Sequence, residues 1–246
     1  MGDRTVAHDP QRDVDGLNDR TLGDRSMAKR TWLSWSSGKD SAWALHVLRQ
    51  QPEFEVTGLF CTVNREFERV AMHAVRVELL NRQAERVGLP VRTIPIPNPC
   101  SNSDYEEIMS GFIAESRRQG IECFAFGDLY LEEIRRYREE KLVGTGIAPI
   151  FPLWGRPTRE LSRDMVNGGL MARITCVDPG RLSPEFAGRI YDKSFLDRIP
   201  ETVDPCGENG EFHTFSFDGP MFDKAVDVVV GETVSRDGFV FTDLLP

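Results

Sequence analysis

The segment Ser34-Trp35-Ser36-Ser37-Gly38-Lys39-Asp40-Ser41 is the feature that most constrains this chain. It follows a short apolar run at 31–33, which predicts a buried strand, and it precedes residues 42–48, which predict a helix. A strand, a turn of small residues and a helix form a phosphate cradle, because the N–H groups of the turn converge and the helix N-terminus is partly positive. The predicted phosphate-binding loop consists of Ser36, Ser37, Gly38, Lys39, Asp40 and Ser41.

The segment departs from a Walker A loop, because Leu33 occupies the first glycine position and Asp40 follows the lysine where Ser or Thr is required. It resembles instead the SGGKDS loop of the PP-loop ATP pyrophosphatases, with Ser37 in place of the first glycine. These enzymes cleave ATP between the α and β phosphates, adenylate an acceptor and release pyrophosphate. The alternative is a serine-capped helix after a strand, without a ligand.

The amino-acid composition limits the functions and cellular locations that this chain can have. A length of 246 residues allows one large domain or two smaller ones, and the net charge of -9 disfavours a general nucleic-acid binder. No apolar run approaches the roughly 18 residues of a membrane span, and no secretory leader is visible. The five cysteines contain no Cys-x-x-Cys pair, which suits a reducing cytoplasm and gives no zinc signature. We therefore expect a cytoplasmic protein without a membrane partner.

The first two thirds of the chain alternate between strand and helix patterns. Residues 1–28 are rich in Asp, Arg and Gly and predict a disordered tail. The predicted strands are 56–63, 91–96 and 123–126; the predicted helices are an apolar stripe from Val70 to Val87 and one opened by a capping box at Ser103–Glu106. This alternation predicts an α/β fold with a doubly wound, mostly parallel sheet. Gly127 and Asp128 then join the 36–41 loop at the carboxyl ends of the strands, where ligands bind.

Prolines at 149, 152 and 157 predict a domain boundary. We expect an ATP-binding domain over 29–154 and a smaller α+β domain over 155–246 that holds the acceptor. Thr158 is predicted to cap a helix that ends at Asn167, and 184–199 to hold one or two short helices. Strands are expected at 170–177, 225–234 and 238–244.

Two further stretches carry candidate functional residues. The charged run 132–140 predicts a helix that is either solvated and laced with ion pairs or turns arginines toward a nucleotide or anionic substrate. The loop 204–214 holds Cys206, Glu208, Glu211 and His213 among glycines. The two glutamates could bind ammonium, hold magnesium or serve as a general base, and Cys206 could be a nucleophile. The alternatives are a β-hairpin with polar turn residues and a hydrogen-bonded structural histidine.

Several stretches together resemble the diphthine–ammonia ligase family of PP-loop ATPases, which are similar to adenine nucleotide alpha hydrolases. They are Ser36–Ser41; Gly127-Asp128-Leu129 with Arg135 and Glu139; Phe151–Trp154; Cys206–Thr214; and Asp218–Phe222. The resemblance spans about residues 30–222. It departs from the diphthamide-pathway pattern at Ser37, Asn209 and Phe212-His213, which are similar to forms of the family's bacterial branch.

The resemblance implies ATP and magnesium, a carboxylate acceptor and ammonia. The acceptor carboxylate would attack the α phosphate, and ammonia would displace AMP to leave an amide. Lys39, Glu208 and Glu211 are the implied catalytic residues, Asp40 an implied magnesium ligand or helix cap, and Asp128 a second metal or ribose contact. Arg135, Cys206, Gly207 and His213 are the implied substrate contacts. A different acceptor, such as a small acid or a tRNA, a non-catalytic ATP sensor, and a homodimer are left open.

Overall fold

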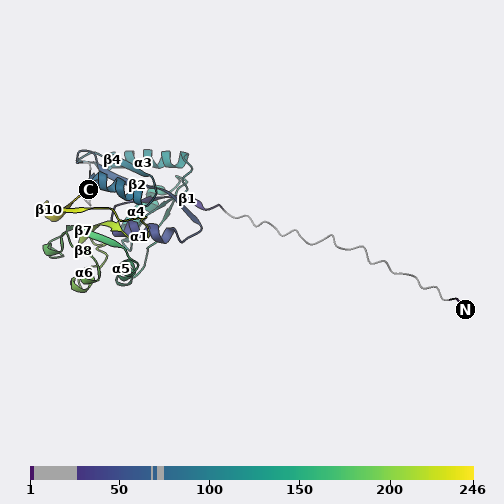
Figure 1. Ribbon diagram of the computed structural model, residues 1–246. Helices are drawn as coiled ribbons and strands as arrows, with labels where there is room; N and C mark the ends of the chain where they lie inside the picture. Colours follow the sequence, from purple (N-terminus) through teal and green to yellow (C-terminus); the bar gives the residue numbers. More distant parts are fainter. Residues whose placement is uncertain (3–26, 68, 71–74) are drawn as a thin grey trace.

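The computed structural model describes residues 1–2, 27–67, 69–70 and 75–246, so the predicted disordered tail lies almost wholly outside the described residues (Figure 1). The elements of the first part of the chain are β1 (Lys29–Ser34), α1 (Lys39–Leu48), β2 (Phe54–Asn64), β3 (Arg69–Val70), α2 (Val77–Arg86), β4 (Val91–Ile96), α3 (Asn102–Arg118), β5 (Cys123–Ala125), α4 (Glu132–Leu142) and β6 (Ala148–Ile150). Those of the second part are α5 (Thr158–Asn167), β7 (Met171–Val177), the 3-10 helix η1 (Pro184–Phe186), β8 (Ile190–Tyr191), α6 (Lys193–Arg198), β9 (Phe212–Asp218), β10 (Val229–Arg236) and β11 (Phe239–Leu245).

The first sheet is parallel except for one short strand. β1 lies between β2 and β5, β4 pairs with β2, and β6 pairs with β5. β3 is antiparallel to the end of β2. The chain builds outward from one side of β1 and then from the other, so the carboxyl end of β1 is the topological switch point of the sheet.

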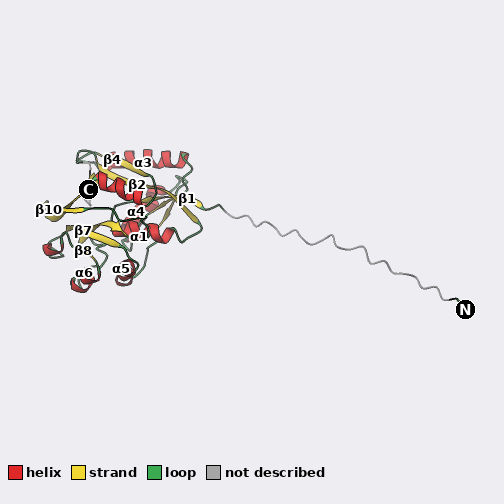
Figure 2. Cartoon of the chain, in the orientation of Figure 1, coloured by secondary structure: helices red, strands yellow, loops and turns green. Residues whose placement is uncertain are grey.

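Side chains alternate between two cores on the two faces of this sheet. Leu33 and Ala125 pack with α1 and α2 in one core, whereas Phe60 and Phe124 pack with α3 and α4 in the other. This is the period of two that a strand imposes on its side chains. Helices therefore cover both faces, as the ribbon in Figure 2 shows, and the predicted doubly wound α/β fold is confirmed.

The second sheet is antiparallel and smaller. β7 pairs with β8, β9 and β11, and β10 completes the sheet beside β11. α5 and α6 lie on one side of β7 and β8 (Figure 1), and with η1 they give the second part of the chain the predicted α+β character. The described residues contain no helix that combines the length and the apolar character needed to cross a bilayer.

One apolar core joins the two sheets. Leu45 and Leu48 of α1 belong to the same buried cluster as Leu161 of α5 and Phe215 of β9. α1 therefore has partners in both parts of the chain, and the division into two domains at residue 154 stays a prediction.

Two predicted helix starts in the first part of the chain were wrong. α2 begins at Val77 rather than Val70, because Val70 lies in β3; Ala74 of the predicted stripe lies outside the described residues. The capping box uses Ser101 rather than Ser103: Ser101 Oγ accepts from the N–H of Asp104 at 3.1 Å, and the Asp104 carboxylate accepts from the N–H of Ser101 at 3.4 Å. Ser101 and Ser103 are equally good N-cap residues by sequence, and the point at which the backbone becomes helical determines that Ser101 is the cap.

The second part of the chain shows two similar shifts. Thr158 is the first residue of α5, and the preceding Pro157 occupies the cap position without a side-chain hydrogen bond. β10 begins at Val229, four residues after the predicted start at Ala225. The Val226 N–H instead donates to Phe217 O at 2.7 Å, which holds the segment before β10 against β9.

Candidate functional site

The loop between β1 and α1 has the backbone form of an anion cradle. Ser37 has a φ of +69°, in the left-handed region that favours glycine. Gly38 is extended and caps α1 without a side chain. Because the first N–H groups of a helix lack carbonyl partners within it, the end of α1 offers donors. Of these, the Lys39 N–H donates to Thr214 Oγ1 of β9 at 3.0 Å.

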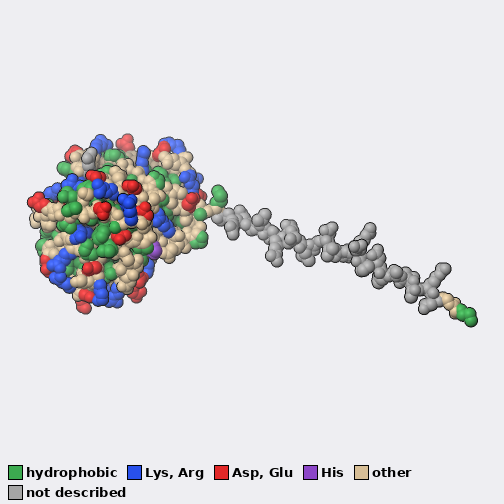
Figure 3. Space-filling model, in the orientation of Figure 1, with side chains coloured by type: hydrophobic (Ala, Val, Ile, Leu, Met, Phe, Trp, Pro, Cys, Tyr) green, Lys and Arg blue, Asp and Glu red, His purple; other side chains and the backbone are tan. Residues whose placement is uncertain are grey.

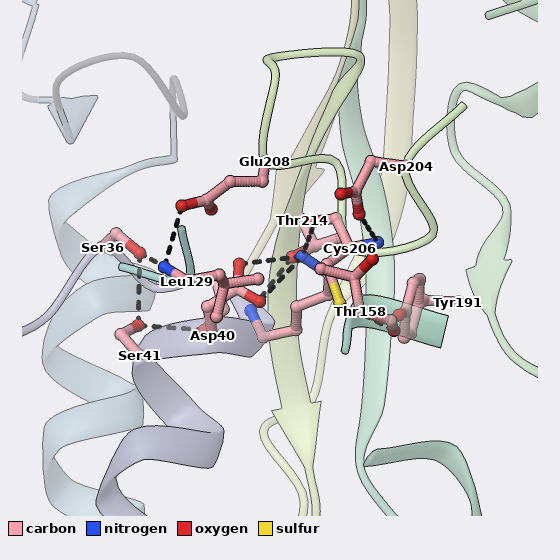
Figure 4. Close-up of polar contacts among 12 residues, drawn as sticks. Ser36, Asp40, Ser41, Leu129, Thr158, Tyr191, Asp204, Cys206, Glu208 and Thr214 are labelled. Carbon is pink, nitrogen blue, oxygen red and sulfur yellow. Dashed lines mark hydrogen bonds and ion pairs between the residues drawn. The ribbon is translucent and has the colours of Figure 1, made fainter. Parts of the chain in front are cut away.

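A cavity of about 240 Å³, which we call the loop cavity, lies at this loop. Its lining residues are Ser34, Ser36, Lys39, Asp40, Ser41, Gly127, Asp128, Arg138, Cys206, Gly207, Glu208, Gly210, Phe212, His213 and Thr214. The structure thus brings together ten of the predicted site residues from three distant stretches, and Figure 4 shows several of them facing one another. Ser37, Gly38, Glu211 and Arg135 do not line it.

Lys39 joins the loop to the second part of the chain. Its side chain is 2% exposed, and Nζ donates to Asp40 Oδ2 at 2.8 Å and to the carbonyl of Cys206. The rings of Tyr191 and Phe212 lie 5.6 and 5.4 Å from Nζ. Burial is the largest influence and lowers the pKa of Lys39, but the charge and hydrogen bond of Asp40, together with Cys206 and Glu208, outweigh it, so the pKa of Lys39 is raised. Lys39 is therefore a fixed positive charge at the wall of the cavity.

Glu208 differs from the other carboxylates of the cavity. Its Oε1 accepts from the N–H of Leu129 at 2.8 Å and of Tyr130 at 3.5 Å (Figure 4). Burial raises the pKa of this carboxyl to about 7. A carboxyl that titrates near neutrality exchanges protons readily at working pH.

Glu211 is buried and faces its own loop. Its Oε1 accepts from the N–H of Asp204 at 3.1 Å and from the Asn209 amide at 3.0 Å, and its Oε2 accepts from the N–H of Asn209 at 3.0 Å. These contacts hold the turn that carries Glu208. The predicted catalytic role of Glu211 stays a prediction, and the contacts place it as a support of the loop.

Cys206 and His213 line the cavity in uncharged forms. Burial raises the pKa of the Cys206 thiol far above its usual value, and Sγ donates to the carbonyl of Thr158 at 3.5 Å. A protonated thiol is a poor nucleophile, so this environment argues against covalent catalysis by Cys206. Burial lowers the pKa of His213 to about 4, so its imidazole is neutral at pH 7.

Two glycines permit close approach at the cavity wall. A Cβ on Gly127 would lie 3.0 Å from the backbone carbon of Asp40, so β5 ends directly against the first turn of α1. Gly207 has a φ of +69°, and a Cβ there would lie 2.8 Å from the carbonyl of Phe212. Gly207 excludes a side chain, whereas a Cβ on Gly127 would require the backbone of α1 to shift by a few tenths of an ångström.

The arginines of α4 divide between two environments. Arg138 forms two hydrogen bonds to Asp128, at 2.6 and 3.0 Å, and its guanidinium lies 4.2 Å from the centre of the Phe126 ring. Arg135, the predicted substrate contact, pairs with Glu139 at 2.7 Å and stacks near Phe151 and Trp154. Arg135 thus lies on the Phe151–Trp154 motif and away from the loop cavity, whereas Arg138 lines it.

A second cavity of about 330 Å³, which we call the aromatic cavity, adjoins the loop cavity, because Ser34, Ser36 and Arg138 line both. Its other lining residues are Trp35, Phe60, Cys61, Thr62, Val70, Tyr105, Glu106, Met109, Ser110, Ile113, Phe124, Phe126, Tyr137, Lys141 and Leu142. Sequence reasoning missed this cavity and the place of Arg138 in it. Tyr105 and Met109 of α3 line this cavity, but apolar and aromatic residues at helical spacing are equally typical of a packing face.

Asp40, Asp128 and Glu208 are the carboxylates of the loop cavity that could hold a metal ion. The described residues hold no group of three or more His, Cys, Asp or Glu side chains arranged for a metal. Asp40 is 28% exposed and offers a hard carboxylate beside the Ser36 and Ser41 hydroxyls, which lie 3.2 Å apart. Mg²⁺ usually takes one or two protein carboxylates and completes its shell with water and substrate phosphates. The donor set therefore fits a magnesium ion that arrives with a nucleotide.

Charges of both signs are interspersed on the face drawn in Figure 3. The strongly one-signed basic surface of a nucleic-acid binder is absent from that face.

A family model for the diphthamide synthase N-terminal domain matches residues 29–146, and one for the diphthamide synthase C-terminal domain matches residues 157–242. The diphthine–ammonia ligase of Homo sapiens is 27% identical over 191 residues, which cover 70% of this chain and 69% of that protein. That of Bos taurus is 26% identical over 160 residues, which cover 63% of this chain and 60% of that protein. The match thus spans less than two thirds of the bovine protein.

Proposed function

The chain belongs to the diphthamide synthase family, and we propose that it is an ATP-dependent ligase that activates a carboxylate as an acyl-adenylate and converts it to an amide with ammonia. The similar human, bovine and zebrafish proteins are named diphthine–ammonia ligase. In this chain the acceptor is a carboxylic acid whose identity the site leaves open.

ATP would lie across the two adjoining cavities. The rings of Phe60, Phe124 and Phe126 suit a nucleoside base in the aromatic cavity, since bases stack on apolar rings. The triphosphate would extend past Ser36 to the end of α1, where N–H groups and Lys39 stabilise negative charge. Asp40 would hold Mg²⁺ with the phosphates, and the ion would offset the charge of the leaving pyrophosphate.

The observation that carries the proposal is the state of Glu208. Of the three carboxylates that line the loop cavity, Asp40 is paired with Lys39 and Asp128 with Arg138. Glu208 has backbone N–H partners and no ion pair among the described residues, and burial raises its pKa to about 7. It is the group best suited to take a proton from ammonium.

The bonds, protons and leaving groups of the proposed reaction are all accounted for by ATP, the acceptor, ammonium and Glu208. An acceptor carboxylate oxygen attacks the α phosphorus, the bond to the β-phosphate oxygen breaks, and pyrophosphate leaves. Glu208 takes a proton from ammonium, and ammonia attacks the acyl carbon. AMP leaves with the bond electrons, and the second proton lost from nitrogen passes to solvent.

Phosphorus NMR with magnesium-ATP, ammonium and a fractionated extract of acids and proteins tests this proposal. We expect AMP and pyrophosphate in a fraction-dependent amount, and the active fraction would yield the acceptor. ADP and phosphate would contradict the mechanism. Binding of ATP without cleavage in any fraction would favour a nucleotide sensor, and activity confined to RNA fractions would favour a tRNA-modifying enzyme.

A further inference from the structure

A buried amide lies behind the nucleotide loop. Gln83 on α2 has 0% exposure, and the residues beside it on this helix face, such as Leu79 and Leu80, are part of an apolar core. Burial of a polar amide among apolar side chains costs free energy unless its hydrogen bonds are made. The local apolar pattern alone would favour leucine at position 83. The buried amide therefore indicates that its hydrogen bonds have a structural or functional role.

The Gln83 amide is fully engaged. Its Oε1 accepts from Trp35 Nε1 at 2.9 Å, and its Nε2 donates to the carbonyl of Ser37 at 3.0 Å and of Ser216 at 2.6 Å. Two of these partners belong to the β1–α1 loop and one to β9. A satisfied buried network of this kind fixes geometry, because any rearrangement leaves a polar group unpaired.

The bond to the Ser37 carbonyl determines the direction of the next N–H group. In a planar trans peptide the C=O and the following N–H point in opposite directions. The Ser37 carbonyl is turned inward, where it accepts from Gln83 and from the N–H of Ser216 at 2.9 Å. The Gly38 N–H then points the other way and donates to Ser36 Oγ at 3.4 Å, and Ser36 lines the loop cavity.

A flip of this peptide would change ψ of Ser37 and φ of Gly38. Gly38 lacks a Cβ and accepts either value of φ, whereas the Cβ of Ser37, at positive φ, disfavours the flipped ψ. A flipped peptide would present a carbonyl oxygen to bound phosphate. The Gln83 side chain opposes that flip.

We propose that Gln83 is a positioning residue for the phosphate end of the nucleotide: it locks the Ser37–Gly38 peptide with its N–H toward the phosphates and ties that peptide to β9. The inference rests on the proposed function, because it takes the ligand of the loop cavity to be a polyphosphate. β9 also carries Thr214, the acceptor of the Lys39 N–H, so the same strand aligns two consecutive N–H groups of the loop.

Calorimetric titration with magnesium-ATP, magnesium pyrophosphate and adenosine tests this role in the full chain. Gln83→Glu keeps the acceptor for Trp35 but places an oxygen against two carbonyls, and Gln83→Met removes all three bonds. Both variants should bind ATP and pyrophosphate at least about tenfold more weakly, since a buried hydrogen bond contributes on the order of that factor. Adenosine affinity should stay within about twofold, because adenosine does not reach the loop. Trp35→Phe deletes the bond that orients the amide and also part of a ring that lines the aromatic cavity, so only its pyrophosphate affinity is diagnostic, and that affinity should fall by less than in the Gln83 variants.

The matched control is Ser116→Ala on α3, which removes a buried hydroxyl that donates to Phe112 O at 2.8 Å, away from the loop. It should lower the melting temperature but leave pyrophosphate affinity unchanged. Equal weakening of adenosine and pyrophosphate in the Gln83 variants, or wild-type pyrophosphate affinity in them, would overturn the positioning role. If the Gln83→Glu variant does not fold, the pyrophosphate affinities of the Gln83→Met and Trp35→Phe variants test the positioning role. A wild-type protein that binds neither ATP nor pyrophosphate would overturn the proposed function itself.

Discussion

The ammonium group of Lys39 donates to the backbone carbonyl of Cys206, which lies 167 residues further along the chain. This contact joins the first turn of α1 to the loop that carries Glu208. The contact therefore couples the position of Lys39, which is expected to stabilise phosphate, to that of Glu208, which is expected to accept a proton. A substitution that displaces one of these residues should also displace the other.

Replacement of Lys39 by Met should abolish the proposed turnover. The variant removes a fixed charge from the loop cavity and leaves Asp40 without its cation. We expect ATP cleavage to fall by on the order of a hundredfold and the free energy of unfolding to fall by about 2 kcal/mol, measured by AMP formation and by urea denaturation. Lys193→Met is the control, because the Lys193–Asp197 pair is exposed. Full ATP turnover in Lys39→Met would remove Lys39 from the cradle.

Glu208 should impose a pH dependence on amide formation. Since burial raises its pKa to about 7, the carboxylate that accepts a proton is populated only above that pH, and the rate should rise as pH increases through 7. Glu208→Gln should keep ATP–pyrophosphate exchange and lose amide formation at every pH. The assay must hold free ammonia constant, because its concentration also rises with pH. Loss of the exchange reaction would instead assign Glu208 to nucleotide binding.

Gly207 should tolerate alanine much less well than Gly210 does. Both glycines have positive φ, +69° and +83°, but a Cβ on Gly207 meets Phe212 whereas one on Gly210 meets nothing within 4 Å. Each substitution should cost about 1 kcal/mol of stability from its backbone conformation. Gly207→Ala alone should also displace Glu208 and lower the rate of amide formation by at least about tenfold. Equal rates in the two variants would show that the position of the Gly207 backbone is unimportant for catalysis.

Ser37→Gly should stabilise the protein. The serine has positive φ, and its buried hydroxyl has no hydrogen-bond partner among the described residues, so it carries two costs. Glycine removes both and adds entropy to the unfolded chain, and the net gain should be about 1 kcal/mol in urea denaturation. Ser37→Val, which is β-branched and clashes in this conformation, should lose stability. A destabilised glycine variant would mean that the hydroxyl makes a bond through water.

The sequence allowed prediction of the fold where one periodicity dominated. The alternation of Trp32 with Leu33, and of Phe124 with Ala125, places successive side chains in opposite cores, and helices cover both. The small residues of the β1–α1 loop likewise pointed to a cradle, because few other tasks need them there.

Prediction was weakest where tertiary packing chooses between equivalent residues. Arg135 and Arg138 are three positions apart on one helix and are chemically identical, yet one stacks on Phe151 and Trp154 and the other enters the cavities. Glu208 and Glu211 are three positions apart in one loop, and the turn directs the first toward Leu129 and the second toward Asn209. The aromatic cavity had no signal of its own, because Phe60 and Phe126 look like ordinary core residues of their strands.

The apolar cluster that α1 shares with α5 and β9 has a consequence for how this chain can be taken apart. A fragment that ended near residue 154 would expose the side of α1 that normally faces Phe215, and the complementary fragment would expose Phe215 itself. Expressed separately, the two fragments should aggregate and be poorly soluble. Expressed together, they should associate through the shared apolar cluster. The chain is therefore a natural candidate for a split reporter whose halves regain nucleotide binding only on reunion.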